Sequence, residues 1–268
     1  MGRDISLTAE FAAQVWHRAH LDNAHFFDFA RGRLAHLCFE AFTKIAAPLL
    51  PDFLRQHDEN LLWRHRVLSE WLLGQEADYV VEIASGYSPR GLTLTRKLPS
   101  ITYYDTDLPE VVAKKRLRIP VAVIPPNYHI RPLDILRQCI SDVFPGQKPS
   151  RRDRVAVLSE GLILYLSPAE RQAAWRNIYD FLGSCGRGAY SFEVYPENGF
   201  AEAGRIGHAY GRALTFLAGR NVLNNLFPDI QAALAALHAV GFTDVRVVAS
   251  KRPREGAPAH CVVVEAIY

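Results

Sequence analysis

The sequence predicts an α/β fold: a mostly parallel seven-stranded sheet, helices on both faces, an N-terminal helical layer and a C-terminal antiparallel hairpin. Three observations support it. From residue 79 onward, short apolar runs alternate with helical segments, which is the pattern of a parallel sheet. Residues 8–74 show helical spacing without a strand signal. The chain closes with a helix, Gly241 and two apolar runs separated by a polar loop.

The first 74 residues are expected to form a helical cap on the core. Apolar residues recur at helical spacing in two segments, the first with Phe11, Val15 and Ala19 and the second with Leu34, Leu37, Ala41 and Ile45. Pro48 and Pro51 end the second segment, because proline cannot continue a helix. Residues 61–73 predict a third amphipathic helix.

Residues 75–268 are expected to form the sheet domain. Its predicted strands are 79–84, 101–105, 127–131, 154–159, 187–195, 242–249 and 261–267. Its predicted helices are 90–98, 108–118, 133–143, 168–183 and 229–240. Residues 196–227 form an insertion in which Gly, His, Tyr and Phe are interspersed. That insertion suits either a substrate cover or helical packing without a functional role.

Composition excludes several classes of protein. The 268 residues suit one large domain, and a net charge of +3 is too small to indicate nucleic acid. Four widely spaced cysteines, Cys38, Cys139, Cys185 and Cys261, predict neither a metal site nor a disulfide framework, so a cytoplasmic location is expected. No run reaches the roughly 18 apolar residues of a membrane span.

A ligand crevice is predicted where the first strand ends. The stretch 80–91 passes from an apolar run through a Gly/Ser turn into a helix, and the next strand ends in Asp105-Thr-Asp107. Ligands of open α/β sheets bind outside the carboxyl ends of the strands, where a carboxylate can accept from both hydroxyls of a ribose. These residues predict an adenosine-containing cofactor.

Three blocks occur in a recognisable order: Glu82-Ile-Ala-Ser-Gly-Tyr-Ser-Pro-Arg90, Asp105-Thr-Asp-Leu-Pro-Glu-Val-Val-Ala-Lys114 and Ser159-Glu-Gly-Leu-Ile-Leu-Tyr-Leu-Ser-Pro168. From about residue 60 to the end, the chain resembles the leucine carboxyl methyltransferase family, most of all its bacterial branch with the tetracenomycin-type polyketide O-methyltransferases. The Glu-Gly-x-x-x-Tyr-Leu block is the most specific part. The resemblance implies the class I, Rossmann-like methyltransferase fold and S-adenosylmethionine as cofactor.

The resemblance also implies roles for residues along the crevice. Gly86 would be the turn glycine that the cofactor approaches, with Glu82 beside it. Asp107 would hold the ribose hydroxyls, and Asp105 is the alternative two residues earlier. Asp134 would accept from the adenine amino group, with Ile135 flanking the ring.

For the methionine end of the cofactor, the resemblance implies Glu160 and an arginine. Glu160 would favour the cationic methionine end, and it needs a partner because it follows a buried apolar run. Arg64 would pair with the methionine carboxylate, since a guanidinium matches a carboxylate in two hydrogen bonds. Arg66 is the alternative on the same helix.

The chain departs from the family pattern at two points. Ala84 stands where the family has the first glycine of the turn, which is tolerable if its φ is negative. Ser88-Pro89-Arg90 replaces the family's Asp-Thr-Arg. Arg90 is retained, and it is expected to pair with a carboxylate inside the fold rather than with the cofactor.

Three functions remain open at this stage. The first is an S-adenosylmethionine-dependent O-methyltransferase for a small, aromatic or polyketide-like carboxylic acid, which needs no general base because its acceptor is already ionised. A phenol acceptor would need one, and His208 is the candidate, with Tyr210 in the same pocket. The second is a protein C-terminal carboxyl methyltransferase, and the third a cofactor-binding partner without catalysis. A nicotinamide oxidoreductase is disfavoured because G-x-G-x-x-G is absent.

Overall fold

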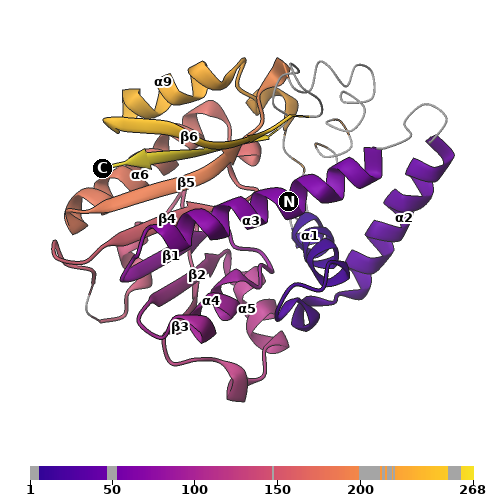
Figure 1. The fold of residues 1–268 in the computed structure, drawn as a ribbon, viewed down its shortest axis with the longest axis horizontal. Coiled ribbons are helices and arrows are strands. Elements are labelled where there is room, and N and C mark those ends of the chain that lie inside the picture. Colours follow the sequence, from indigo (N-terminus) through magenta and orange to yellow (C-terminus); the bar gives the residue numbers. More distant parts are fainter. Residues whose placement is uncertain are drawn as a thin grey trace.

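The computed structural model describes residues 6–46, 53–146, 148–198, 212, 215, 219, 221–252 and 261–268. Its centre is one seven-stranded sheet with the order β3-β2-β1-β4-β5-β7-β6 (Figure 1). The strands are β1 Tyr79–Ile83, β2 Thr102–Asp107, β3 Tyr128–Pro132, β4 Val155–Ser159, β5 Gly188–Val194, β6 Asp244–Lys251 and β7 Cys261–Ile267. The first five are parallel, and β7 lies antiparallel between β5 and β6. The predicted sheet and its terminal hairpin are confirmed.

Helices cover both faces of the sheet (Figure 1). The main ones are α1 Ser6–Arg18, α2 Ala30–Ala46, α3 Phe53–Gly74, α4 Arg90–Lys97, α5 Pro109–Arg118, α6 Pro168–Cys185 and α9 Ile230–Val240. Short 3-10 turns lie at Ala24–Phe27, Val121–Val123, Ile140–Val143, Ile163–Tyr165 and Leu223–Asn225. Successive strand residues point to opposite faces. Val80 therefore joins the core under α3, α4 and α5, while Val81 joins the core under α6 and α9.

Local sequence sets both ends of helix α6. α6 begins with a capping box in which Ser167 and Glu170 each bond the other's backbone N–H, and it ends at Gly186 with φ +85°. The predicted helix 133–143 is wrong, because only Ile140–Val143 forms a 3-10 turn there. The Asp134 carboxylate accepts from the N–H of Leu136 at 3.1 Å, and such local bonds compete with a helix.

The N-terminal segments are helical, as their spacing predicts, but α2 does not bury its leucines. Leu34 and Leu37 are 62% and 56% exposed. The buried face of α2 carries Gly32 and His36 instead. A Cβ at Gly32 would lie 2.4 Å from the backbone oxygen of Glu10, so this glycine lets α2 approach α1. Close backbone approach, rather than leucine spacing, sets the orientation of α2.

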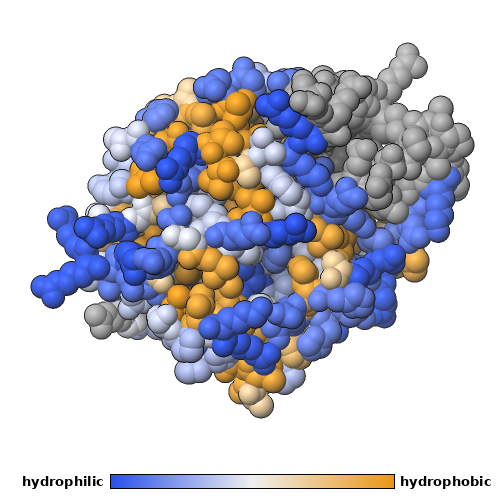
Figure 2. Space-filling model, viewed as in Figure 1, coloured by the Kyte–Doolittle hydropathy of each residue, from blue (hydrophilic) through white to orange (hydrophobic). Residues whose placement is uncertain are grey.

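Helix α3 crosses the sheet and ties its middle to the terminal hairpin (Figure 1). The Trp71 indole donates to the Glu265 carboxylate of β7 at 2.8 Å, and Gln75 donates to the same oxygen at 3.0 Å. In the space-filling view, apolar side chains gather on either side of the polar outer surface of α3 (Figure 2). Arg64 and His65 lie on the buried face of this helix.

Candidate functional site

The turn between β1 and α4 is left-handed at two residues. Ala84 has φ +53° and Gly86 has φ +54°. The condition under which an alanine is readily tolerated at this position, a negative φ, is therefore not met. The turn is held by backbone bonds from Ser85 to Thr106 and from Ser88 to Ser85, both 3.0 Å. A left-handed alanine costs about 1–2 kcal/mol, so tertiary structure imposes this conformation.

Helix α1 lies over the same turn. A Cβ at Gly86 would lie 3.2 Å from the Cβ of Ala9 in α1. Further along α1, the Trp16 ring contacts the His65 ring with centroids 4.9 Å apart. The first helix thus covers the carboxyl ends of the central strands.

The two aspartates of β2 have different environments. Asp105 is fully buried and accepts from Lys115 at 2.6 Å, from Tyr128 at 2.5 Å and from Ser85. Asp107 is partly exposed and accepts from the backbone N–H of Gly86 at 2.6 Å and of Leu108 at 2.7 Å. Burial raises the pKa of Asp107 to about 6. Asp105 is used inside the fold, whereas Asp107 keeps part of its surface exposed.

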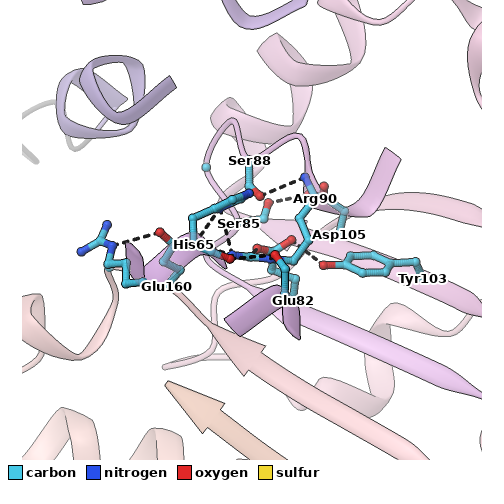
Figure 3. Close-up of polar contacts among 12 residues, drawn as sticks. His65, Glu82, Ser85, Ser88, Arg90, Tyr103, Asp105 and Glu160 are labelled. Atoms are coloured by element: carbon cyan, nitrogen blue, oxygen red, sulfur yellow. Dashed lines mark hydrogen bonds and ion pairs between the residues drawn. The ribbon is translucent and has the colours of Figure 1, made fainter. Parts of the chain in front are cut away.

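A buried network of charges fills the carboxyl ends of β1 and β4 (Figure 3). Arg90, at the start of α4, pairs with Glu82 of β1 and, at 2.5 Å, with Glu160 after β4. The His65 Nδ1 lies 3.0 Å from Glu160 Oε2 and 2.9 Å from Arg90 Nη2. Arg90 is therefore satisfied inside the fold, and the expected partner of Glu160 is present.

The burial and close packing of these charges shift their pKa values. Burial raises the pKa of Glu82, against the opposing effect of Arg90. Burial acts in the same direction on Glu160, but the charges and hydrogen bonds of His65, Arg90 and Arg64 hold its pKa well below the usual range. Burial, together with Arg90, lowers the pKa of His65. The network thus favours an ionised Glu160 beside a neutral imidazole.

Arg64 joins the network from α3, and Arg66 does not. The Arg64 Nε donates to Glu160 Oε1 at 2.9 Å, and its Nη1 donates to the Tyr195 hydroxyl at 2.7 Å. Arg66 is exposed, because residues two apart on a helix face nearly opposite directions. Of the two arginines that the sequence left open, only Arg64 lies at the carboxyl ends of the strands.

The sequence analysis missed several residues of this network: His65, Tyr195, Glu193 and Gly161. Glu193, near the end of β5, is 2% exposed, and its Oε1 accepts from the Gly161 N–H at 2.6 Å. Burial raises the pKa of Glu193 to about 7. Gly161 has φ +73°, a conformation that favours glycine. A charge within the apolar run 188–194 was the signal for Glu193, the same signal that identified Glu160.

The remaining predicted residues lie outside this network. Asp134 follows β3, where its carboxylate caps Leu136 and lies 3.5 Å from Arg137. Ile135 is 7% exposed and packs in the core under α6. His208, Tyr210 and most of the insertion 196–227 lie outside the described residues.

The sheet order and the antiparallel seventh strand define a class I methyltransferase fold. The model of the leucine carboxyl methyltransferase family matches residues 24–179, more than half of the chain. The match starts earlier and ends earlier than the resemblance in the sequence suggested. The chain belongs to the leucine carboxyl methyltransferase family. Its cofactor is accordingly S-adenosylmethionine.

Solved structures share the fold at low identity. A putative O-methyltransferase from Nostoc punctiforme PCC 73102 has TM-score 0.55 and 12% identity, covering 80% of this chain and 59% of its own. The S-adenosylmethionine-dependent methyltransferase SibL has TM-score 0.53 and 16% identity, covering 94% and 61%. The magnesium protoporphyrin IX methyltransferase of Synechocystis PCC 6803, solved with bound SAH, has TM-score 0.54 and 13% identity, covering 80% and 86%.

The chain spans about 60% of the length of the first two of these structures. No curated protein matches it in sequence. Within the part of the chain that the structure describes, no helix combines the length and apolar character that crossing a membrane requires.

Proposed function

We propose that this protein is an O-methyltransferase that moves the methyl group of S-adenosylmethionine to an oxygen of a small acceptor. One observation carries the proposal. The carboxyl edge of the sheet presents Asp107 at β2 and Arg64 beside β4, with the Gly86 turn between them. A carboxylate suits ribose hydroxyls and a guanidinium suits a carboxylate. The edge therefore offers matching groups for both ends of this cofactor.

The residues divide the binding task. Asp107 would accept from the ribose hydroxyls in place of the Gly86 N–H that it now holds. Asp134 and Ile135, after β3, would contact the adenine. Arg64 would donate to the methionine carboxylate through Nη2, since its hydrogen bonds to described residues use Nε and Nη1. These groups fit the cofactor by type and by their order along the sheet.

In methyl transfer the protein mainly positions the reacting groups, because the cofactor supplies the activated methyl group. Bound S-adenosylmethionine supplies an activated methyl group on a sulfonium. The chain has to orient the acceptor oxygen and keep water away, and such positioning can lower a barrier by about 7–11 kcal/mol. Ala9 over Gly86 and Trp16 against His65 support a covering role for the N-terminal helices. A covered site favours a small acceptor over a protein tail.

We propose a carboxylic acid, aromatic or polyketide-like, as the first acceptor to test. A carboxylate is ionised near pH 7 and needs no base. A phenol would need one, and His208, with Tyr210 nearby, is the candidate for it. A reducing cytoplasm is the proposed location, supported by the free thiols of all four cysteines.

The test is transfer of an isotope-labelled methyl group from S-adenosylmethionine to matched pairs of aromatic acids and phenols. Labelled ester from the acids supports carboxylate methylation, and labelled ether from the phenols redirects the proposal to hydroxyl acceptors. Label only on a peptide C-terminus would contradict a small acceptor. An absence of transfer to all of these would favour a cofactor-binding protein without catalysis.

A further inference from the structure

The sheet ends in an open edge at β6. This strand is the last in the sheet order, and within the residues that the structure describes only β7 pairs with it (Figure 1). The backbone N–H and C=O groups on the outer side of an edge strand can form a ladder with another strand. Two valines in the middle of β6, Val247 and Val248, are 43% and 38% exposed. An edge strand with an apolar centre favours the addition of a further strand.

A bulge in β6 restricts which strand can pair with it. The register with β7 shifts between Val247 and Ala249, so β6 carries one extra residue there. Such a bulge bends a strand and disrupts pairing with a regular partner. A second copy of β6 carries the same extra residue at the same place. Pairing about a two-fold axis at the centre of the strand therefore brings the two bulges opposite each other, and the two strands match residue for residue.

The bulge also decides which side chains of β6 share a face of the sheet. The side of α9 carries the residues opposite the β7 side chains in the core under α6 and α9: Val245, Val247 and Ser250. The side of α3 carries the other residues of the register: Asp244, Arg246, Ala249 and Lys251. Antiparallel pairing of two copies about the bulge sets each residue against one from the same side. A shift by one residue would oppose side chains from different sides.

The charges at the two ends of β6 are complementary in this arrangement. Asp244, at the start of the strand, is exposed and forms no hydrogen bond or ion pair within the described part of the chain. Lys251, at the end, has only a long contact with Glu59, at 4.0 Å. Antiparallel pairing places Asp244 of each copy opposite Lys251 of the other. Parallel pairing would oppose like charges, so the charges favour the antiparallel arrangement.

The middle of the strand would be covered by the same pairing. Val247 lines an apolar groove together with Ile230 of α9 and Val262 of β7. In the antiparallel arrangement, Val248 of the second copy lies opposite Val247, beside this groove. Both valines of both copies then leave water, which is favourable for apolar surface.

We propose that β6 is a homodimer interface, in which two copies of this chain pair antiparallel with Asp244 opposite Lys251 and Val247 opposite Val248. One continuous sheet then runs through both copies. A two-fold contact uses the same surface on each copy and closes, so it does not extend into a filament. Because β7 and β5 separate β6 from the central strands, the carboxyl ends of β1 and β4 stay clear of the interface. The interface is independent of the proposed function.

Sedimentation velocity over a range of protein concentrations tests the interface. The wild-type protein should form a dimer that dissociates on dilution. Val248→Lys places a charge in the middle of the edge and should give a monomer at concentrations at which the wild type is dimeric. Leu117→Lys is the matched control, since this leucine is 87% exposed on α5, which packs beside β2 and β3. The control variant should remain dimeric.

A charge swap tests the register. Asp244→Lys would oppose two lysines at each end of the paired strands, and Lys251→Asp would oppose two aspartates. Each single variant should raise the dimer dissociation constant about 10-fold or more, because two attractive pairs become repulsive. The double variant restores opposite charges and should bring the constant back to within about 3-fold of wild type.

Three results would overturn the proposal. A wild type that is monomeric at all concentrations would exclude the dimer. A dimer that Val248→Lys leaves intact would show that two copies meet through another surface. A double variant that dimerises as weakly as the single variants would exclude the antiparallel register. The binding of S-adenosylhomocysteine is measured separately and tests the proposed function alone.

Discussion

Arg64 of α3 and Glu160 after β4 lie 96 residues apart in the chain and meet at 2.9 Å between Nε and Oε1. The contact joins the N-terminal helices to the carboxyl edge of the sheet. Both residues are buried, at 9% and 8% exposure. Removing one partner of such a pair leaves charge without compensation, which usually costs more than the pair contributes.

Replacing Arg64 should therefore damage both stability and binding. Arg64→Met should lower the free energy of unfolding by about 3–5 kcal/mol, because Glu193 and Tyr195 lose their cationic partner. Arg66→Met, on the exposed face of the same helix, should change it by less than about 0.5 kcal/mol. Urea unfolding measures both variants, and similar losses would contradict the placement of Arg64.

The two aspartates of β2 should separate stability from cofactor affinity. Asp105→Asn should destabilise the protein by about 3–5 kcal/mol, since it leaves Lys115 buried without its carboxylate. Asp107→Asn should cost far less stability but weaken S-adenosylhomocysteine by about 10-fold or more. Thermal unfolding and calorimetry check the pair. An Asp107→Asn protein with unchanged affinity would refute the ribose assignment.

The pH dependence of the free energy of unfolding should show the raised pKa of Glu193. Its folded pKa of about 7 lies above the ordinary 4.5, so the folded state holds the extra proton between these values. Stability from this group is present below about pH 4.5 and is lost as pH rises through 7, by about 3 kcal/mol. Glu193→Gln should therefore stabilise the cofactor-free protein at pH 8 and matter little at pH 5.

Urea unfolding at the two pH values measures this effect. The expected result for Glu193→Gln is a higher free energy of unfolding than wild type at pH 8 and a similar one at pH 5. A variant destabilised at pH 8 would show that ionised Glu193 supports the free fold instead.

Ala84 offers a test of the strained turn. Ala84→Gly removes a left-handed strain of about 1–2 kcal/mol and adds unfolded-state entropy of about 0.4–1 kcal/mol. The net effect should be a gain of between zero and about 1.6 kcal/mol, seen as a higher unfolding midpoint. A clear loss of stability would mean that the alanine methyl makes packing contacts worth more than the strain.

Sequence reasoning succeeded where a local pattern carried the information. The alternation of strands and helices predicted the sheet, and the charge of Glu160 after a buried run predicted a buried partner. It preferred Asp107 but kept Asp105 as an alternative, because the buried pairing of Asp105 depends on Lys115, which reaches it from α5. Likewise, the left-handed φ of Ala84 is imposed by contacts with β2 that no local propensity encodes.

The orientation of the N-terminal helices could not be predicted from the sequence either. Leucine spacing identified α2 as a helix, yet Gly32 and the backbone of Glu10 decided which side of it is buried. Glu193 was missed for a related reason. Its importance lies in an oxygen left without a donor, and only the packing of Gly161 and Arg64 around it shows that.

The central claim is that this chain binds S-adenosylmethionine at the carboxyl edge of its sheet. Thermal unfolding of the wild-type protein with S-adenosylhomocysteine, beside NADH, tests it most directly. A ligand at 100 times its dissociation constant stabilises by about 2.7 kcal/mol. We predict an upward shift of the midpoint with S-adenosylhomocysteine and none with NADH. No shift with S-adenosylhomocysteine, or a shift with NADH alone, would contradict the claim.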